Sequence, residues 1–231
     1  MIKPDVQFEL LLVRHGQSLG NAGIPGRSVR ERQDPDLSPE GCRQAKLLAK
    51  RFRHYSLDAV FSSGLLRAVH TASMVASMQP KDGAHTVEIL PLLTECNTLE
   101  NYTGQTMDEI RALYPAASPA EGRSDAQTVL PNDETTDEQY NIDRARQALD
   151  YLKNRFQNGE RVMVVAHGVF NTVLLMQALE VREQRFDPDF NNTSVTHLTF
   201  YKAGTGPWGF DVRLHCLNDR THLFVKKTLF L

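Results

Sequence analysis

The sequence predicts an α/β fold: a three-layer α/β/α sandwich with a mainly parallel central sheet and an antiparallel element near the C-terminus. Two observations support this prediction. Short apolar runs alternate with segments of helical period over most of the chain, as in proteins whose helices cover both faces of a parallel sheet. The run at residues 162–166, Val-Met-Val-Val-Ala, is continuously apolar and rich in β-branched side chains, as in a central parallel strand.

The first elements follow this alternation. Residues 8–13 form a short apolar run that predicts a buried strand. A serine followed by a proline marks the start of a helix over residues 38–54, because serine caps helices and proline suits the first helical turn. A second short strand is predicted at 58–61, and a helix with an apolar stripe follows over 65–76.

The middle of the chain is less regular. A third strand is predicted at 86–90 and a short helix at 106–114, which a proline ends. Residues 116–131 show no period, and this stretch is longer than most loops in compact domains. We therefore expect a single domain over residues 1–231 with a lid or insertion around 96–134.

The last third of the chain has the clearest helix, predicted from Thr135 to Asn158, with Thr135 and Glu138 at capping-box spacing. After the central strand, a further helix is predicted over 169–179. Residues 194–201 and 212–217 predict two strands joined through a Gly-Thr-Gly-Pro turn, and apolar and polar residues alternate in the second. This terminal hairpin is the antiparallel element.

Composition excludes several classes of protein. The 26 basic and 28 acidic side chains give a formal charge of −2, whereas coating nucleic acid or an anionic membrane requires a basic excess. Cys42, Cys96 and Cys216 are too few and too scattered for a disulfide framework or a zinc site, which indicates a reducing compartment. The apolar runs are far shorter than the roughly 18 residues of a membrane span, and no basic-then-apolar leader opens the chain. We expect a cytoplasmic protein.

Polar side chains gather at the ends of the predicted strands. Arg14 and His15 follow the first strand, Arg67 follows the second, Glu95 the third and His167 the fourth. Ligands of parallel sheets bind outside the carboxyl ends of the strands, so these side chains are expected on one rim. The guanidinium fork matches phosphate oxygens, and an unprotonated imidazole nitrogen can attack phosphorus. The set therefore favours phosphoryl transfer.

The residues after the first strand, Val13-Arg14-His15-Gly16-Gln17-Ser18-Leu19-Gly20-Asn21, resemble the signature of the histidine phosphatase superfamily, the phosphoglycerate-mutase-like proteins. Further segments in the same order resemble other motifs of that family: Asp36-Leu37-Ser38 with Gly41, Gln44 and Ala45; Ser62-Ser63 with Arg67, Thr71 and Ala72; Leu93-Thr94-Glu95; and Ala166-His167-Gly168. The resemblance extends from about Leu10 to Ser194, which is most of the chain.

The resemblance implies that His15 is the catalytic nucleophile and becomes phosphohistidine. It also implies that Glu95 is the general acid that protonates the leaving alkoxide and then the base that activates water. The groups expected to contact the substrate phosphate are Arg14, Asn21, Arg67, the catalytic His167 and Gly168. No metal and no other cofactor is expected.

Some assignments have alternatives. Glu100 and Asp108 are alternatives to Glu95, because both lie near it and the glycine pattern that usually follows the family's acid is altered here. Glu95 is favoured over both. A loop carries three arginines that are either substrate contacts or, as we favour, solvated: Arg27, Arg30 and Arg32. A zinc site built from the two histidines and Glu95 is disfavoured by the adjacent arginines.

The sequence therefore predicts a phosphatase of the histidine acid type, a phosphomonoester hydrolase without metal, acting on a small phosphorylated metabolite. Phosphoglycerate mutase-type phosphoryl transfer ranks second, because the segment after Glu95 does not resemble the basic, proline-rich substrate loop of those mutases. A catalytically silent scaffold that binds a phospholigand ranks third, because all the expected catalytic residue types are present. We expect no nucleic-acid partner and no membrane.

Overall fold

A computed structural model describes most of the chain, and everything below concerns the ranges that it describes: residues 5–96, 102, 104–122, 128–130, 132–181 and 187–224. Within these ranges the strands form one seven-stranded sheet in the order β4-β3-β2-β5-β1-β6-β7. Its strands are β1 (Val6–Arg14), β2 (Ala59–Ser62), β3 (Val87–Ile89), β4 (Ala117–Pro119), β5 (Glu160–Ala166), β6 (Val195–Tyr201) and β7 (Val212–Asp219).

The strand directions agree with the predicted sheet. Strands β4, β3, β2, β5 and β1 pair in parallel, whereas β6 is antiparallel to β1 and β7 is antiparallel to β6. The α-helices are α1 (Val29–Gln33), α2 (Pro39–Phe52), α3 (Leu66–Ala76), α4 (Met107–Leu113), α5 (Asn132–Thr135), α6 (Glu138–Arg155) and α7 (Gly168–Ala178). Three short 3-10 helices are η1 (Pro91–Leu93), η2 (Pro207–Gly209) and η3 (Thr221–Phe224). Within the described ranges no helix is both long and apolar enough to span a bilayer.

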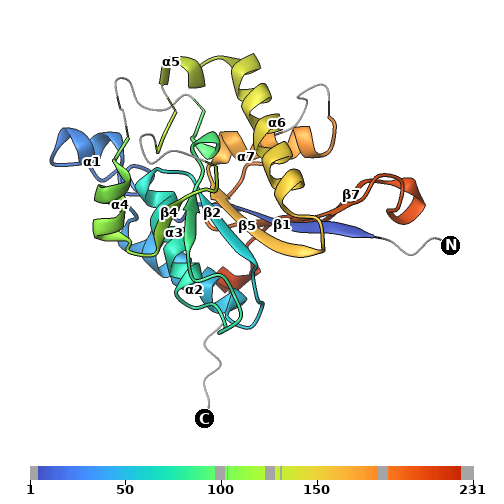
Figure 1. The fold of residues 1–231 in the computed structure, drawn as a ribbon. Coiled ribbons are helices and arrows are strands. Elements are labelled where there is room, and N and C mark those ends of the chain that lie inside the picture. Colours follow the sequence, from blue (N-terminus) through green and yellow to red (C-terminus); the bar gives the residue numbers. More distant parts are fainter. Residues whose placement is uncertain are drawn as a thin grey trace, which may run out of the picture.

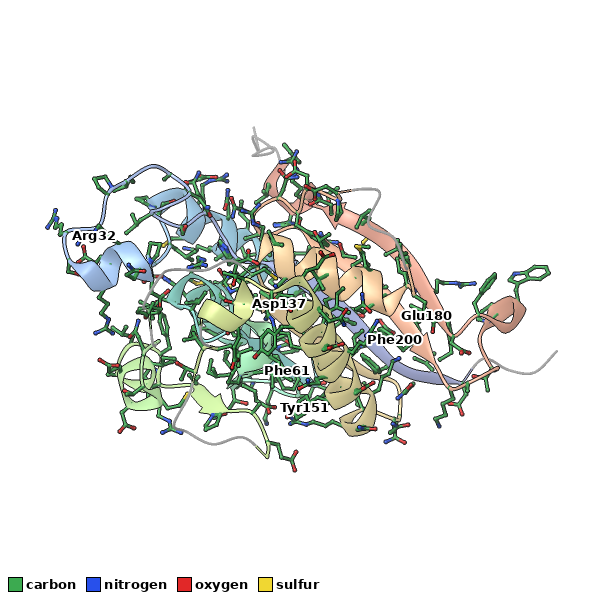
Figure 2. The ribbon with its side chains drawn as sticks, turned by 90° about the horizontal axis from the view of Figure 1, so that it is seen from above. Arg32, Phe61, Asp137, Tyr151, Glu180 and Phe200 are labelled. Carbon is green, nitrogen blue, oxygen red and sulfur yellow. The ribbon has the colours of Figure 1, made fainter. Side chains whose placement is uncertain are left out.

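The sheet separates two apolar cores, which confirms the three-layer prediction. Helices α6 and α7 cover one face, and α2 and α3 cover the other (Figure 1). Alternate residues of β1 point into opposite cores: Leu10 and Leu12 pack with the α6 and α7 side, while Leu11 and Val13 pack with the α2 and α3 side. On the α6 side, Phe61 of β2 meets Tyr151 of α6 edge to face, with ring centroids 5.9 Å apart (Figure 2). Both cores hold the strand ends in place.

Side-chain caps explain where the helices begin, and one predicted cap is wrong. Ser38 accepts the N–H of Gly41 at the start of α2, as predicted. The predicted box of Thr135 and Glu138 does not form, because α5 occupies residues up to Thr135 and the helix α6 starts later. Asp137 is its N-cap and accepts the N–H of Tyr140 (Figure 2). An aspartate next to the first turn also suits the positive end of the helix dipole.

Two further elements escaped prediction. The stretch expected to lack regular structure, 116–131, contains the edge strand β4, in which Ala117 pairs with Val87 of β3. Three residues are too few to show an alternating pattern. The loop before α2 contains the helix α1, which Ser28 caps by accepting the N–H of Glu31. The lid around 96–134 stays a prediction, since part of that range lies outside the described residues.

Candidate active site

The register of the two central strands places the two glycine-flanked histidines side by side. Arg14 of β1 is paired with Ala166 of β5, so the next residue of each parallel strand, His15 and His167, emerges at the same edge. The N–H of His15 donates to the carbonyl of Ala166 at 3.0 Å, and the two imidazole ring centroids are 5.1 Å apart. This is the rim that the sequence predicts for the site.

The imidazole of His15 is held in one tautomer. Its side chain is buried, and Nδ1 lies 2.7 Å from the carbonyl oxygen of Gly16, which can only accept a hydrogen bond. Nδ1 therefore carries the proton, and Nε2 has a free electron pair. The Nε–H of Arg67 donates to that Nε2 at 3.2 Å. Nε2 is thus the nitrogen available as a nucleophile.

The surroundings of both histidines favour the neutral ring. Burial lowers the pKa of His15 well below its usual range, and the charges of Arg67 and Arg14 lower it further. Burial also lowers the pKa of His167, with the Arg67 charge as the next cause. Within the described part of the chain, neither ring nitrogen of His167 has a hydrogen-bond partner, although both are buried. Such buried polar atoms are normally paired, so a ligand atom is the natural partner.

Titration of the histidine rings tests this charge state. In ¹⁵N spectra of the chain, we expect His15 and His167 to stay neutral at pH 6.5, where a free histidine is half protonated. His15→Gln and His167→Gln variants assign the signals. Because unfolded histidines titrate near pH 6.5, the free energy of unfolding should fall as the pH drops below that value. A ring of either residue that is protonated at pH 6.5 contradicts the assignment.

Arg14 is fixed by a loop that also holds the backbone of His15. Its Nη1 donates to the carbonyl of Phe190, and Asn192 of the same loop donates to the carbonyl of His15 at 3.0 Å. Gly168 lies against the guanidinium: a Cβ on this glycine would be 3.5 Å from the Arg14 Cζ. The Nε of Arg14 is buried and has no partner within the described residues. This arginine therefore keeps a donor for a ligand.

Glu95 lies at the N-terminus of α7. Its Oε1 accepts the N–H of Phe170 at 2.9 Å, and its Oε2 lies 3.4 Å from the N–H of Val169. The carboxylate takes the place of a side-chain cap, because the N-cap residue His167 makes no such bond. Negative charge is favourable there, since helix N-termini carry free N–H groups and a positive dipole end.

A cavity of about 280 Å³ borders both Glu95 and Arg14. It is lined by Arg14, Glu95, Gly168, Val169, Thr172, Asp187, Asp189 and Phe190. The described residues thus gather His15, His167, Arg67, Arg14 and Glu95 around one site, as the sequence predicts. In the described ranges no three His, Cys, Asp or Glu side chains are grouped as a metal site requires.

The remaining predicted residues lie farther out. Asn21 is exposed and closes a turn, where its Oδ1 accepts the N–H of Ser18 at 3.3 Å, so its phosphate contact stays a prediction. Arg30 pairs with Glu109 at 3.4 Å, and Arg32 points outward from α1 (Figure 2). Of the alternative acids, the Asp108 side chain is 95% exposed on α4, and Glu100 lies outside the described residues.

Sequence reasoning missed two charged residues near the site. Asp34 is 1% exposed and its Oδ1 lies 3.8 Å from Nη1 of Arg67; a lone aspartate in an irregular loop gives no signal. Arg144, also 1% exposed, donates to the carbonyls of Leu92 and Thr94 just before Glu95. Its position on the buried stripe of α6 was a usable signal, because an arginine at helical spacing among core residues requires internal acceptors.

Several known proteins are similar to this chain in sequence. Residues 10–207 match the histidine phosphatase superfamily (branch 1). Phosphoserine phosphatase 1 of Hydrogenobacter thermophilus is 29% identical over 165 residues, covering 70% of this chain and 71% of that protein. A 2,3-bisphosphoglycerate-dependent phosphoglycerate mutase of Bradyrhizobium sp. is 28% identical over 173 residues, covering 72% and 79%.

Solved structures agree on the fold. The phosphoserine phosphatase of Entamoeba histolytica, in complex with 3-phosphoglyceric acid, superposes with a TM-score of 0.58 at 21% identity, covering 94% of this chain and 99% of that one. The range matched by the family, residues 10–207, includes both histidines, both arginines and Glu95. The chain belongs to the histidine phosphatase superfamily.

Proposed function

We propose that this chain is a phosphomonoester hydrolase that acts without a metal, through phosphohistidine, on a small phosphorylated metabolite. The observation that carries the proposal is the buried, neutral His15, whose Nε2 faces Arg67 and lies beside the unpartnered ring of His167. A neutral imidazole with its proton on Nδ1 is the form that can attack phosphorus. The relative named phosphoserine phosphatase 1 supports hydrolysis of a small phosphorylated metabolite.

The first step transfers the phosphoryl group to the enzyme. Substrate phosphate oxygens take over the Nε–H of Arg67, which frees the His15 electron pair. Nε2 then forms a bond to phosphorus as the bond from phosphorus to the ester oxygen breaks. Glu95 is protonated only for this step: it gives its proton to the departing oxygen and becomes the carboxylate that the N–H groups of Phe170 and Val169 stabilise. Arg14, Arg67 and His167 offset the charge on the other phosphate oxygens, which is the main contribution a protein makes to this reaction.

The second step returns the enzyme to its starting state. The Glu95 carboxylate takes a proton from a water molecule, and the water oxygen forms a bond to phosphorus as the bond to His15 Nε2 breaks. Inorganic phosphate leaves, and Glu95 is again protonated. The position of Glu95 on the wall of the cavity, beside Gly168 and Arg14, supports both roles.

The wall of the cavity favours hydrolysis over mutase chemistry. A phosphoglycerate mutase must hold a substrate that carries two phosphates during part of its cycle. Asp187 and Asp189 line the cavity next to Glu95, and their charges oppose a second anionic group. The volume of about 280 Å³ suits a small organic part. We therefore place hydrolysis first and mutase-type transfer second.

We also propose that the protein is cytoplasmic. Cys42, Cys96 and Cys216 are all free thiols in the structure, which fits a reducing cytoplasm. The formal charge of −2 supports a small phosphorylated substrate rather than a nucleic acid as partner.

Hydrolysis of p-nitrophenyl phosphate in the presence of EDTA tests the proposal, with Glu95→Gln as the decisive variant. We expect metal-free turnover by the parent, and a loss of roughly 10²–10⁴-fold in steady-state turnover for the variant. The initial burst of nitrophenol should survive, because this leaving group needs little protonation, whereas release of phosphate should be slow. An alkyl phosphate such as O-phosphoserine should lose its burst as well.

Asp108→Asn is the matched control, since Asp108 is an exposed carboxylate on α4. It should leave turnover unchanged. If Asp108→Asn shows the loss and Glu95→Gln does not, the acid is misassigned. A parent that binds phosphate but shows no turnover from acid to neutral pH is a scaffold, and the proposed function is then wrong.

A further inference from the structure

A buried carboxylate lies close to the Arg67 guanidinium, at a different nitrogen from the one that faces His15. Asp34 comes from the loop before α2, and its side chain is fully buried. Its Oδ1 accepts the N–H of Leu66 at 2.9 Å, and its Oδ2 accepts the hydroxyl of Tyr102 at 2.9 Å. The amide of Gln105 also donates to Oδ2, at 3.4 Å. Burial raises the pKa of the Asp34 carboxyl, whereas the Arg67 charge and these three donors lower it and favour the ionised form.

Asp34 and His15 contact different parts of the same guanidinium. Nη1 of Arg67 lies 3.8 Å from Oδ1 of Asp34, and the Arg67 Nε donates to Nε2 of His15 at 3.2 Å. The arginine is buried, and burial lowers its pKa while the Asp34 charge raises it. The guanidinium of Arg67 is planar, so a hydrogen bond that holds its Nε leaves the whole group little freedom to rotate.

We propose that Asp34 is a positioning residue that orients Arg67, so that its fork meets the substrate phosphate when His15 is released to attack. This inference rests on the proposed function. Arg67 must leave the His15 electron pair when phosphate arrives, and it then needs a second anchor. Asp34 supplies that anchor at Nη1, and Leu66, the first residue of α3, ties the carboxylate to the helix that carries Arg67.

The anchor also joins the arginine to the middle of the chain. Tyr102 and Gln105 hold Oδ2, and the side-chain oxygen of Gln105 accepts a hydrogen bond from Arg30 in α1. That bond turns the amide so that its NH₂ group faces Asp34. The carboxylate is therefore held directly by two segments of the chain and, through Gln105, by α1. This suits a group that must hold a catalytic arginine within a fraction of an ångström.

The chain provides a matched control two residues away. Asp36 accepts the hydroxyl of Tyr114 at 3.0 Å and the N–H of Leu37 at 2.6 Å, and it faces His70 at 2.8 Å. It thus resembles Asp34 in chemistry, in its tyrosine partner and in its loop. None of its described hydrogen bonds or ion pairs reaches Arg67 or His15.

The experiment compares Asp34→Asn with Asp36→Asn. We expect Asp34→Asn to lower kcat/KM for p-nitrophenyl phosphate by roughly 10–100-fold, the scale of a misplaced catalytic group, with most of the loss in kcat. Asp36→Asn should stay within about twofold, since exposed or remote substitutions rarely do more. Equal losses in the two variants, or an unchanged kcat/KM in Asp34→Asn, overturn the proposal.

A second measurement separates orientation from general damage. The charged and titratable groups that face the His15 ring are Arg14, Arg67 and His167, with Glu95 and Asp34 acting on Arg67. Removing the Asp34 charge leaves the site more positive, so the ¹⁵N titration of His15 should move to lower pH in Asp34→Asn and not in Asp36→Asn. Structural damage would admit water and move this titration upward instead, which would count against the proposal.

A double variant keeps the test decisive if Asp34→Asn fails to fold. In Arg67→Gln/Asp34→Asn the buried pair carries no charge, so folding should recover relative to either single variant. If the single variants fold, Asp34→Asn should cause no further loss of kcat/KM in the Arg67→Gln background. Additive losses there mean that Asp34 does not act through Arg67.

Failure of the proposed function gives a different result. A parent without turnover would refute hydrolysis, but inorganic phosphate could still be used as a probe of the same site. Asp34→Asn should then weaken phosphate binding by roughly tenfold, while Asp36→Asn should not. Equal phosphate affinity in the two variants overturns the role of Asp34 without reference to catalysis.

Discussion

Replacing His15 with alanine should abolish turnover, with a loss on the order of 10⁵–10⁶-fold in kcat, the scale seen when a covalent nucleophile is removed. The imidazole is buried, its tautomer is set by Gly16, and its attacking nitrogen faces Arg67. A water molecule in the vacated space would have neither this position nor this nucleophilicity. Steady-state hydrolysis of p-nitrophenyl phosphate, measured with EDTA present, provides the number.

The covalent intermediate gives an independent readout. Rapid quenching with labelled substrate should yield a protein-bound phosphate that is lost in acid and kept in base, as a phosphorus–nitrogen bond requires, and His15→Ala should yield none. His54→Ala is the control, since His54 is exposed and bonds only its neighbour Arg53 among the described residues. Turnover or labelling that persists in His15→Ala would falsify the assignment of the nucleophile.

The largest effect on stability is expected for Arg144→Met. Beyond the two carbonyls before Glu95, Arg144 donates to Oδ1 of Asn141 at 2.8 Å and contacts the Cys96 sulfur at 3.2 Å. Its guanidinium also stacks 4.2 Å from the ring centre of Phe170. Methionine fills similar space but leaves the carbonyls of Leu92 and Thr94 without this donor, at a cost of about 1–3 kcal/mol for each unsatisfied group.

The expected loss is therefore about 3 kcal/mol in the free energy of unfolding, or roughly 6–12 °C in Tm for a chain of this size. Denaturant unfolding at neutral pH and calorimetry measure it. Arg146→Met is the control: its side chain is 57% exposed and pairs with Asp143 at 3.0 Å, and such surface changes stay within about 0.5 kcal/mol. If the loss in Arg144→Met is as small as that in Arg146→Met, the carbonyls of Leu92 and Thr94 have found other partners.

Local pattern was enough to predict the rim of the site. Strands that are apolar throughout are typical of the centre of a parallel sheet, and parallel strands bring their carboxyl ends to one edge, so His15 and His167 were expected on one rim. That β1 and β5 are direct neighbours came from the structure. The end of a strand is a local property, which a single sequence reveals. The same holds for the cap at Ser38, whose partner lies three residues away.

Contacts between distant segments were beyond this reasoning. The pairing of Asp34 with Arg67, and of Phe190 with Arg14, depends on how irregular loops pack, and neither loop has a period. Competition between two local signals explains the wrong cap of α6: Thr135 and Asp137 are both good N-caps, and tertiary packing selects Asp137. The edge strand β4 is short enough to depend on β3 for its formation.

The hydrogen bond between Arg67 and His15 makes the resting enzyme selective for reagents that carry an anionic oxygen, whatever the shape of the substrate pocket. The electron pair on Nε2 already has a partner, so a reagent reaches it only by offering Arg67 a better acceptor. A phosphate ester carries anionic oxygens that can do so, whereas a neutral acyl or alkyl electrophile cannot. In the proposed mechanism, His15 is thus shielded from chance modification, and the exposure of its Nε2 depends on an oxyanion. Inorganic phosphate satisfies the same condition, and the product should therefore compete with every new substrate.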